Sequence, residues 1–161
     1  MYSIRSVVGA LVSLFLLFAC AADPKMEAAR EEKTLQVARI LSETSDYGEP
    51  RRCLRSHEYR NFEILDDRRI IFSGARDRLW LNQLRGTCPG LRTGHALKFV
   101  SRTGMSQICD LDSFEVVDFF YYPRFRRWPW YWFDGVRCTL GRFEPITEQQ
   151  AESLQMALKP G

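Results

Sequence analysis

The feature that most restricts how this sequence can fold is a set of four cysteines after residue 50. They are Cys53, Cys88, Cys109 and Cys138. An even set of cysteines in an exported chain predicts two disulfides. Four cysteines can pair in three ways, and their spacing does not choose among them. The pairing that we expect joins Cys88 to Cys109 and Cys53 to Cys138, which ties the first predicted strand of the domain to the last.

The same cysteines do not form the pattern of a metal site. The chain has no Cys-x-x-Cys, and only His57 and His95 could add imidazole ligands. Structural zinc sites need four ligands, usually at close and regular spacing. We therefore expect no metal and no cofactor.

An apolar run near the N-terminus predicts export. The residues from Val7 to Ala19 carry no charge and follow Arg5. At about 1.5 Å per residue a helix of this length reaches roughly 20 Å, which is short of the roughly 30 Å that a spanning helix must cross. A positive start, a brief apolar middle and a small residue at the end are typical of a secretory signal peptide. The sequence thus predicts a signal peptide over residues 1–19.

The end of this run resembles the lipobox of bacterial lipoproteins. The matching residues are Leu17-Phe18-Ala19-Cys20, and in such proteins the signal is cut before the cysteine, whose thiol is acylated. The resemblance implies acyl chains such as palmitate on Cys20, and several chains together hold a protein on a bilayer. Asp23 lies one place too late for the usual inner-membrane retention signal. The resemblance therefore implies an outer-membrane lipoprotein that faces the periplasm.

The mature chain is predicted to divide into a lipidated tether, residues 20–50, and a folded domain, residues 51–161. The tether is rich in Ala, Glu, Lys and Arg, has little apolar face, and is interrupted by Gly48 and Pro50. This composition favours a charged, partly helical spacer.

From Cys53 onward the sequence shows short strand patterns separated by turn signals. In "RLWLNQL", for example, Leu79 and Leu81 point to one side of a strand, and Trp80 and Asn82 point to the other. About seven such stretches follow one another without a helix between them. They predict an all-β domain, mostly antiparallel, built as a small barrel or a sandwich.

A single helix is predicted near the C-terminal end. Thr147 and Gln150 fit a capping box, and Ala151, Leu154 and Leu158 form a narrow apolar stripe. We expect this helix to cover an open edge or an end of the sheet.

The placement of the cysteines resembles that of a known family. The resemblance rests on Cys53, "TCPGL" at 87–91, "ICDLD" at 108–112 and "CTLGRFEPIT" at 138–147. The family consists of small proteobacterial lipoproteins and is known only as a domain of unknown function. The resemblance implies an exported, disulfide-bonded domain, and it implies no activity, catalytic residue or ligand.

The charge balance gives no reason to expect a nucleic-acid partner. Without residues 1–19 the 23 basic residues fall to 22, because Arg5 is removed, against 20 acidic residues and a formal charge of +2. Nucleic-acid-binding domains usually carry a larger basic excess.

Two groups of residues could carry catalysis, and for both we favour a structural role. Ser56 and His57 are adjacent, so on a strand they would point to opposite faces and not form a dyad. The second group is an acidic cluster of Asp110, Asp112, Glu115 and Asp118. A calcium loop needs oxygen ligands and a glycine at set positions, where this cluster has Phe114 and Glu115. Carboxylates near a turn more often cap backbone amides or face solvent.

The segment "FFYYPRFRRWPWYWF", residues 119–133, is the most unusual part of the chain. Ten of its fifteen residues are aromatic, against 21 in the whole chain. Pro123 and Pro129 interrupt strand pairing, so we predict a long hairpin loop. Three roles are open: the rings cap the sheet, form a patch for a protein or glycan, or rest on a membrane. The candidate partner-binding residues are Arg124, Arg126, Arg127, Trp128, Trp130 and Trp132.

These observations favour a non-enzymatic lipoprotein of the cell envelope, a disulfide-bonded β module that binds a protein, glycan or membrane partner through its aromatic segment. One alternative is an inhibitor of a cell-wall hydrolase, by analogy with other small disulfide-linked β lipoproteins. Another is a small periplasmic enzyme that uses the acidic cluster, residues 110–118.

Overall fold

The structure, a computed structural model, describes residues 23–43, 48–102, 104, 106–117 and 136–159. The chain falls into two compact units, Met1–Gln36 and Val37–Gly161. Helix α2 (Pro24–Ser42) crosses the boundary between these units. In the part of the chain that the structure describes, each helix is too short or too polar to cross a bilayer.

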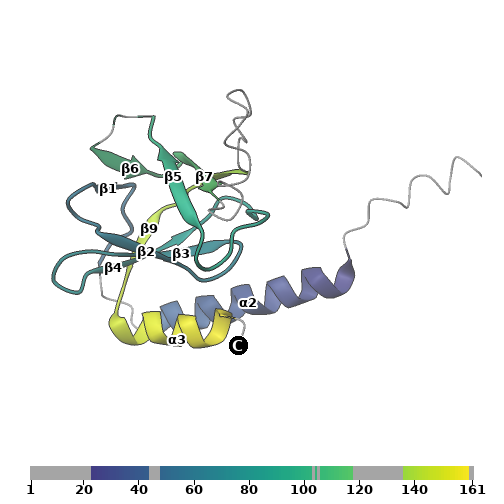
Figure 1. Cartoon of the computed structure of the whole chain (residues 1–161). Helices are drawn as coiled ribbons and strands as arrows, with labels where there is room; N and C mark the ends of the chain where they lie inside the picture. Colours follow the sequence, from purple (N-terminus) through teal and green to yellow (C-terminus); the bar gives the residue numbers. More distant parts are fainter. Residues whose placement is uncertain (1–22, 44–47, 103, 105, 118–135, 160–161) are drawn as a thin grey trace, which may run out of the picture. The chain divides into compact units, whose positions relative to one another are not determined.

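Among the described residues, nine strands form three antiparallel sheets in the second unit (Figure 1). A four-stranded sheet has the order β2-β3-β4-β9, a three-stranded sheet has the order β5-β7-β8, and β1 pairs with β6. The strands are β1 (Cys53–Arg55), β2 (Asn61–Ile64), β3 (Arg69–Ser73), β4 (Leu79–Gln83), β5 (Ala96–Val100), β6 (Gln107–Cys109), β7 (Ser113–Val117), β8 (Arg137–Thr139) and β9 (Phe143–Ile146). The predicted mostly antiparallel β domain is confirmed, with more and shorter strands than the sequence indicated.

The described strands do not close into a barrel, which was one of the two predicted forms. Aromatic rings make the contact between the edge strands β2 and β5 instead. Phe62 of β2 lies 6.0 Å from Phe99 of β5, edge to face, and Phe99 lies 5.9 Å from Phe72. Aromatic pairs attract one another at centroid separations of about 4.5–7 Å, so ring packing joins the two sheets where no strand ladder does.

Strand β3 shows why the four-stranded sheet is buried on both faces. Ile70, Ile71 and Phe72 are each no more than 3% exposed. Successive strand residues point to opposite faces, so Ile70 and Phe72 join one core cluster while Ile71 joins the other. The alternation predicted for the next strand is confirmed, because Trp80 lies in the first cluster and Leu81 in the second.

Helix α3 (Glu148–Leu158) covers the second of these faces and lies beneath the sheet in Figure 1. The predicted capping box is confirmed. The Thr147 hydroxyl accepts a hydrogen bond from the backbone N–H of Gln150, and the Gln150 side chain accepts one from the backbone N–H of Thr147. The four backbone donors at a helix start need such partners, so this pair defines where α3 begins.

The last turns of α2 belong to the same unit. Val37 is 1% exposed and shares a core cluster with Leu154 of α3. The side-chain amide of Gln150 donates to the carbonyl of Ile40 at 3.2 Å. The second compact unit begins at Val37, because the end of the charged helix carries apolar residues that pack under the sheet.

The cysteines form two disulfides, as predicted, but the expected pairing is wrong. Cys53 is bonded to Cys109 and Cys88 to Cys138. The reason lies in the strand pairing, since β1 runs antiparallel to β6 and places Cys53 opposite Cys109 with the Cα atoms 4.0 Å apart. With sequence separations of 56 and 50 residues, each bond stabilises the fold by about 4 kcal/mol, taken singly in the chain-entropy model.

Gly141 offers a test of the packing between β4 and the chain after β8. A Cβ at Gly141 would collide with the backbone carbonyl of Gln83. The side chain of Asn82 also bonds the Gly141 carbonyl at 2.8 Å and its N–H at 3.0 Å, so the two segments are held together. We predict that Gly141→Ala lowers the free energy of unfolding by about 3 kcal/mol, measured by urea denaturation.

Gly86→Ala is the matched control for this substitution. A Cβ at Gly86 meets nothing within 4 Å, and Gly86 is not in the left-handed region. This variant should stay within about 1 kcal/mol of the wild type. Equal losses in the two variants would contradict the close approach at Gly141.

Candidate functional site

Several of the residues singled out from the sequence lie outside the described residues. They are Cys20, Asp118, Arg124, Arg126, Arg127, Trp128, Trp130 and Trp132. The structure does place three other candidates: the remaining carboxylates of the acidic cluster, both histidines, and a groove beside α3.

Asp110 is a buried carboxylate between two arginines. Its side chain is 6% exposed, and its Oδ1 lies 3.2 Å from Nε of Arg52 while Oδ2 lies 3.8 Å from a terminal nitrogen of Arg85. Both arginine side chains are more than half exposed. A buried charge is tolerated when it is paired, so this carboxylate joins the segments that carry Arg52 and Arg85.

Asp112 closes the turn that follows β6. Its Oδ2 accepts a hydrogen bond from the backbone N–H of Cys109 at 2.8 Å, and its Oδ1 accepts one from the N–H of Arg102 at 3.0 Å. Within the turn Leu111 has φ 71°, a left-handed conformation that costs a residue with a Cβ about 1–2 kcal/mol. Asp112 thus caps backbone amides, the structural role that the sequence favoured for it.

Glu115 lies on β7 between cations of the two neighbouring strands. Its Oε1 is 2.7 Å from a guanidinium nitrogen of Arg137 on β8, and its Oε2 is 3.2 Å from Nζ of Lys98 on β5. Hydrogen bonds from Arg137 and then from Lys98 lower the pKa of Glu115. A general acid or base that works near neutral pH needs a pKa close to that pH. The lowered pKa of Glu115 therefore fits a charged carboxylate in an ion pair better than a catalytic group.

The three described carboxylates of the cluster therefore do not form one site. Each has its own partners, which are two arginines for Asp110, two backbone amides for Asp112, and an arginine with a lysine for Glu115. Over the described ranges, no three His, Cys, Asp or Glu side chains lie together in a way that could hold a metal ion.

The two histidines differ in exposure. His57 is exposed in the turn between β1 and β2, beside Ser56. His95 is half-buried just ahead of β5, and its backbone N–H donates to the carbonyl of Arg92 at 3.2 Å. His57 is thus a surface histidine, and His95 is a partly packed one.

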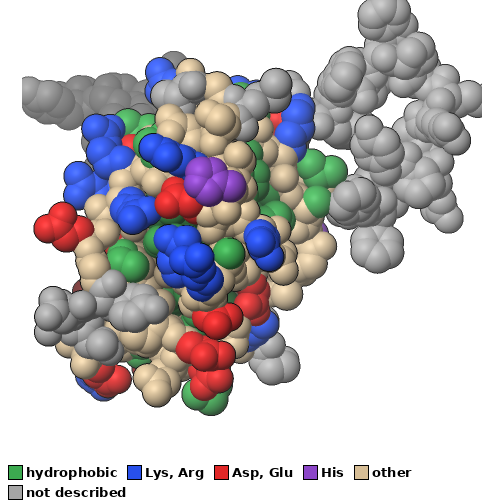
Figure 2. All heavy atoms as spheres, turned by 90° about the vertical axis from the view of Figure 1, so that its left-hand side faces the viewer, with side chains coloured by type: hydrophobic (Ala, Val, Ile, Leu, Met, Phe, Trp, Pro, Cys, Tyr) green, Lys and Arg blue, Asp and Glu red, His purple; other side chains and the backbone are tan. Residues whose placement is uncertain are grey.

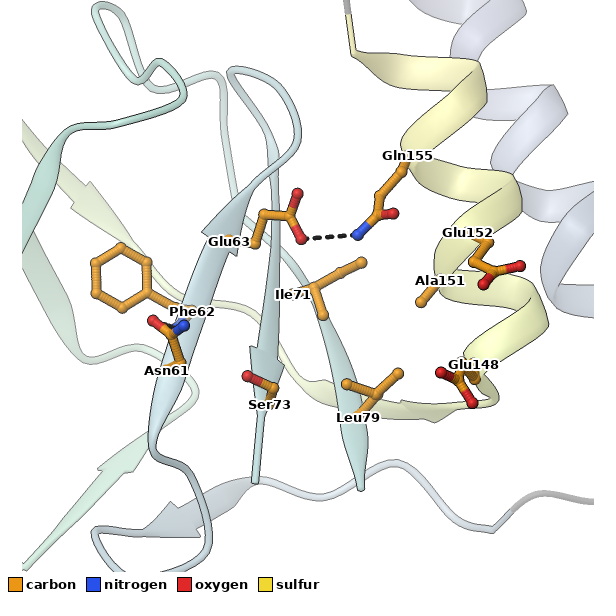
Figure 3. A pocket seen from close by; sticks show the side chains of 10 residues that line it. All are labelled: Asn61, Phe62, Glu63, Ile71, Ser73, Leu79, Glu148, Ala151, Glu152 and Gln155. Carbon is orange, nitrogen blue, oxygen red and sulfur yellow. Dashed lines mark hydrogen bonds between the residues drawn. The ribbon is translucent and has the colours of Figure 1, made fainter. Parts of the chain in front are cut away.

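A groove of about 280 Å³ opens between the four-stranded sheet and α3 (Figure 3). Ile71 and Leu79 from the sheet and Ala151 from the helix line its middle. Asn61, Phe62, Ser73 and Gln155 also line it, together with three acidic residues. The groove is smaller than the roughly 300–1,000 Å³ of pockets that enclose drug-sized ligands, so it suits one or two side chains of a partner.

The three acidic residues give the groove a negative border. Glu63 accepts a hydrogen bond from the Gln155 side chain at 2.7 Å and also pairs with Lys159. Glu148 and Glu152 are exposed and lie one turn apart on the same side of α3. A cationic group with an apolar body fits this combination of an apolar middle and an acidic border.

Sequence reasoning missed this groove. Its lining comes from residues 61–79 and 148–155, which are far apart in the chain, so no local motif marks it. The only local signal is the pair of glutamates on the polar side of the capped C-terminal helix.

Comparison with known proteins places the chain in a family. The model of the family of unknown function DUF6491 matches residues 3–160. No curated protein and no solved structure matches the chain. The fold and the groove are therefore interpreted from their own geometry.

The ion pairs of Glu115 predict how this residue titrates. Its pKa lies below the ordinary value because Arg137 and Lys98 favour the charged carboxylate. The unfolded chain takes up this proton at a higher pH than the folded chain does, so the contribution of Glu115 to the free energy of unfolding is lost as the pH falls through its folded-state pKa. An NMR titration of the side-chain carboxyl should show the low midpoint, and Arg137→Met should raise it.

Arg142→Met is the control for this titration, since it removes an exposed arginine after β8 and leaves Arg137 in place. It should leave the Glu115 midpoint at the wild-type value. A midpoint that Arg137→Met does not move would contradict the ion pair.

Proposed function

We propose that this chain, which belongs to the family of unknown function DUF6491, is a non-enzymatic lipoprotein of the bacterial cell envelope. The observation that carries the proposal is the pair of disulfides, Cys53–Cys109 and Cys88–Cys138. Cytosolic thiols are kept reduced, whereas disulfides persist in the periplasm. A domain held by two of them supports export, and residues 1–19 have the composition of an export signal.

In this proposal Cys20 carries the membrane anchor. Cleavage before Cys20 and acylation of its thiol give an outer-membrane lipoprotein that faces the periplasm, because Asp23 comes too late for inner-membrane retention. The acyl chains supply the membrane affinity, at about 0.8 kcal/mol per buried methylene. The residues between Cys20 and Val37 then connect the anchor to the folded unit, which begins at Val37.

A non-enzymatic role is supported by what the carboxylates do. Asp110 and Glu115 are engaged by arginine and lysine side chains, and Asp112 is engaged by backbone amides. A catalytic carboxylate has to offer its lone pairs or its proton to a substrate. The three carboxylates use their oxygen atoms to hold strands and a turn together. This favours a binding module over the alternative of an enzyme with its catalytic residues at 110–118.

The proposed partner site is the aromatic segment, residues 119–133. The chain leaves the sheet at Val117 and returns at Arg137 on the neighbouring strand, so one strand pair carries both ends of the segment. Its tryptophans and arginines are the residue types that dominate binding hot spots. Binding segments are often loops on a rigid scaffold, and the three-stranded sheet is such a scaffold.

Labelling of growing bacteria with a palmitate analogue tests the anchor. The wild-type chain should be labelled and should fractionate with the outer membrane, whereas Cys20→Ser should lose the label because no thiol remains to be acylated. Asp23→Asn is the control and should be labelled like the wild type. Retention of label in Cys20→Ser would contradict acylation at this position.

Replacement of Trp128, Trp130 and Trp132 by Ala tests the partner site. Co-purification of an envelope partner with the wild-type chain should be lost in the triple variant, since its three largest rings are gone. Both chains should give the same disulfides and the same midpoint of thermal unfolding, which shows that the fold is kept. Unchanged recovery of the partner would reject the aromatic segment as the binding site.

A further inference from the structure

A rigid turn presents an exposed leucine. Leu111 is 46% exposed and has φ 71°, a conformation that few residues other than glycine adopt. The turn cannot relax to hide the side chain, because the N–H of Asp110 donates to the carbonyl of Arg52 at 2.7 Å and the N–H of Leu111 donates to that of Leu140 at 3.1 Å. Backbone strain that the surrounding structure maintains in this way is concentrated at functional positions.

Two arginines pair with the residue that precedes this leucine. Arg52 and Arg85 both reach Asp110, the residue before Leu111, and their side chains are 69% and 54% exposed. One carboxylate cannot balance two guanidinium groups, so the surface around Leu111 keeps a positive charge. Guanidinium groups bind carboxylates in a defined, often bidentate geometry.

A third arginine extends this positive surface. Arg51 and Phe143 form an antiparallel bridge, which places Arg142 beside Arg52 at the next position. Arg142 is exposed. Figure 2 shows the side of the molecule on which β1 and β6 lie in Figure 1, where several Lys and Arg side chains gather, with hydrophobic side chains, a histidine and acidic side chains among them. We call Leu111 with these three arginines the Leu111 knob.

The groove beside α3 has the complementary features. Its middle is apolar, with Ile71 at 3% exposure and Ala151 at 5%. Its border carries the exposed Glu148 and Glu152, together with Glu63, which already pairs with Lys159. A leucine side chain fits a groove of about 280 Å³, and arginines around that leucine would meet the acidic border. The knob and the groove thus match in polarity and charge.

The knob of a molecule cannot enter the groove of the same molecule. Figure 1 shows β6, which leads into the Leu111 turn, on the opposite side of the four-stranded sheet from α3, which borders the groove. We infer that the Leu111 knob of one copy of this chain docks into the α3 groove of a second copy. The inference goes beyond the proposed function, since it uses neither the lipid anchor nor the aromatic segment.

Docking of two different surfaces makes the contact head-to-tail. Each copy keeps a free knob at one end and a free groove at the other, so the contact builds open chains or rings and not a closed pair with two-fold symmetry. A single knob covers much less area than the roughly 1,200–2,000 Å² of stable interfaces. The contact is therefore weak and reversible, and it depends on protein concentration.

Sedimentation velocity on the mature chain, residues 20–161, tests the inference. Cys20→Ser removes the acylation site, and export through a cleavable secretory signal lets the disulfides form. The weight-average mass should rise with concentration over the micromolar to millimolar range. Leu111→Gly should weaken the association about tenfold, because it removes an apolar side chain that the groove would bury. Glycine adopts φ 71° without strain, so this variant keeps the fold.

Met156→Ala is the matched control for Leu111→Gly. Met156 lies on α3, is 79% exposed and does not line the groove. Its replacement therefore removes an apolar side chain that is more exposed than Leu111 and lies outside both docking surfaces. This variant should associate like the wild type. A weakening equal to that of Leu111→Gly would overturn the assignment of Leu111 as the docking residue.

A charge-reversal pair tests the head-to-tail geometry. Arg142→Glu in the knob and Glu152→Arg in the groove should each remain monomeric, whereas an equal mixture of the two should form heterodimers. In the mixture, the wild-type knob of the Glu152→Arg chain can dock into the wild-type groove of the Arg142→Glu chain. Glu49→Arg, at an exposed glutamate outside the groove, should associate like the wild type.

Three results would overturn the inference. The first is a wild-type chain that stays monomeric over the whole range of concentration. The second is wild-type association of either charge variant on its own. The third is a mixture of the two charge variants that remains monomeric.

Discussion

The turn of residues 109–112 is the constraint on which the rest of the domain depends. The disulfide to Cys53 fastens β6 to β1, and the Asp112 carboxylate holds the amides of Cys109 and Arg102. Leu140 and Asp112 are also joined by a backbone hydrogen bond of 2.9 Å, which brings in the chain after β8. A ribbon of two three-residue strands is not stable alone in water. The covalent bond and the buried carboxylate supply the stability that its short ladder lacks.

Local patterns predicted those parts of the fold that local geometry decides. The alternation of Trp80 and Leu81 and the capping box of Thr147 with Gln150 depend on residues close together in the chain. The disulfide pairing and the start of the unit at Val37 depend on residues from distant segments. Val37 lies in a helix rich in charged residues, and its packing in one cluster with Leu154 of α3 makes it part of the core. That packing could not be predicted from the sequence, and neither could the groove beside α3.

The charged residues of the candidate site divide into two kinds. Asp110, Asp112 and Glu115 are buried and serve the fold. The capping of backbone amides, expected for carboxylates near a turn, occurs at Asp112, whereas Asp110 and Glu115 form ion pairs instead. The arginines that hold Asp110 were not predictable, because Arg52 and Arg85 come from distant segments. Exposed charges remain at the knob around Leu111 and at the acidic border of the α3 groove. We therefore expect any recognition by the described part of the chain at these two surfaces, where Arg142, Glu148 and Glu152 are exposed.

Disulfide mapping of the chain isolated from the bacterial envelope tests the central claim most directly, which is that an oxidised turn at residues 109–112 organises the domain. Proteolysis without reduction, followed by mass spectrometry, should yield one peptide pair that joins Cys53 to Cys109 and another that joins Cys88 to Cys138. None of these four thiols should react with an alkylating reagent before reduction. Free thiols at Cys53 and Cys109, or a bond from Cys53 to Cys138, would contradict the account.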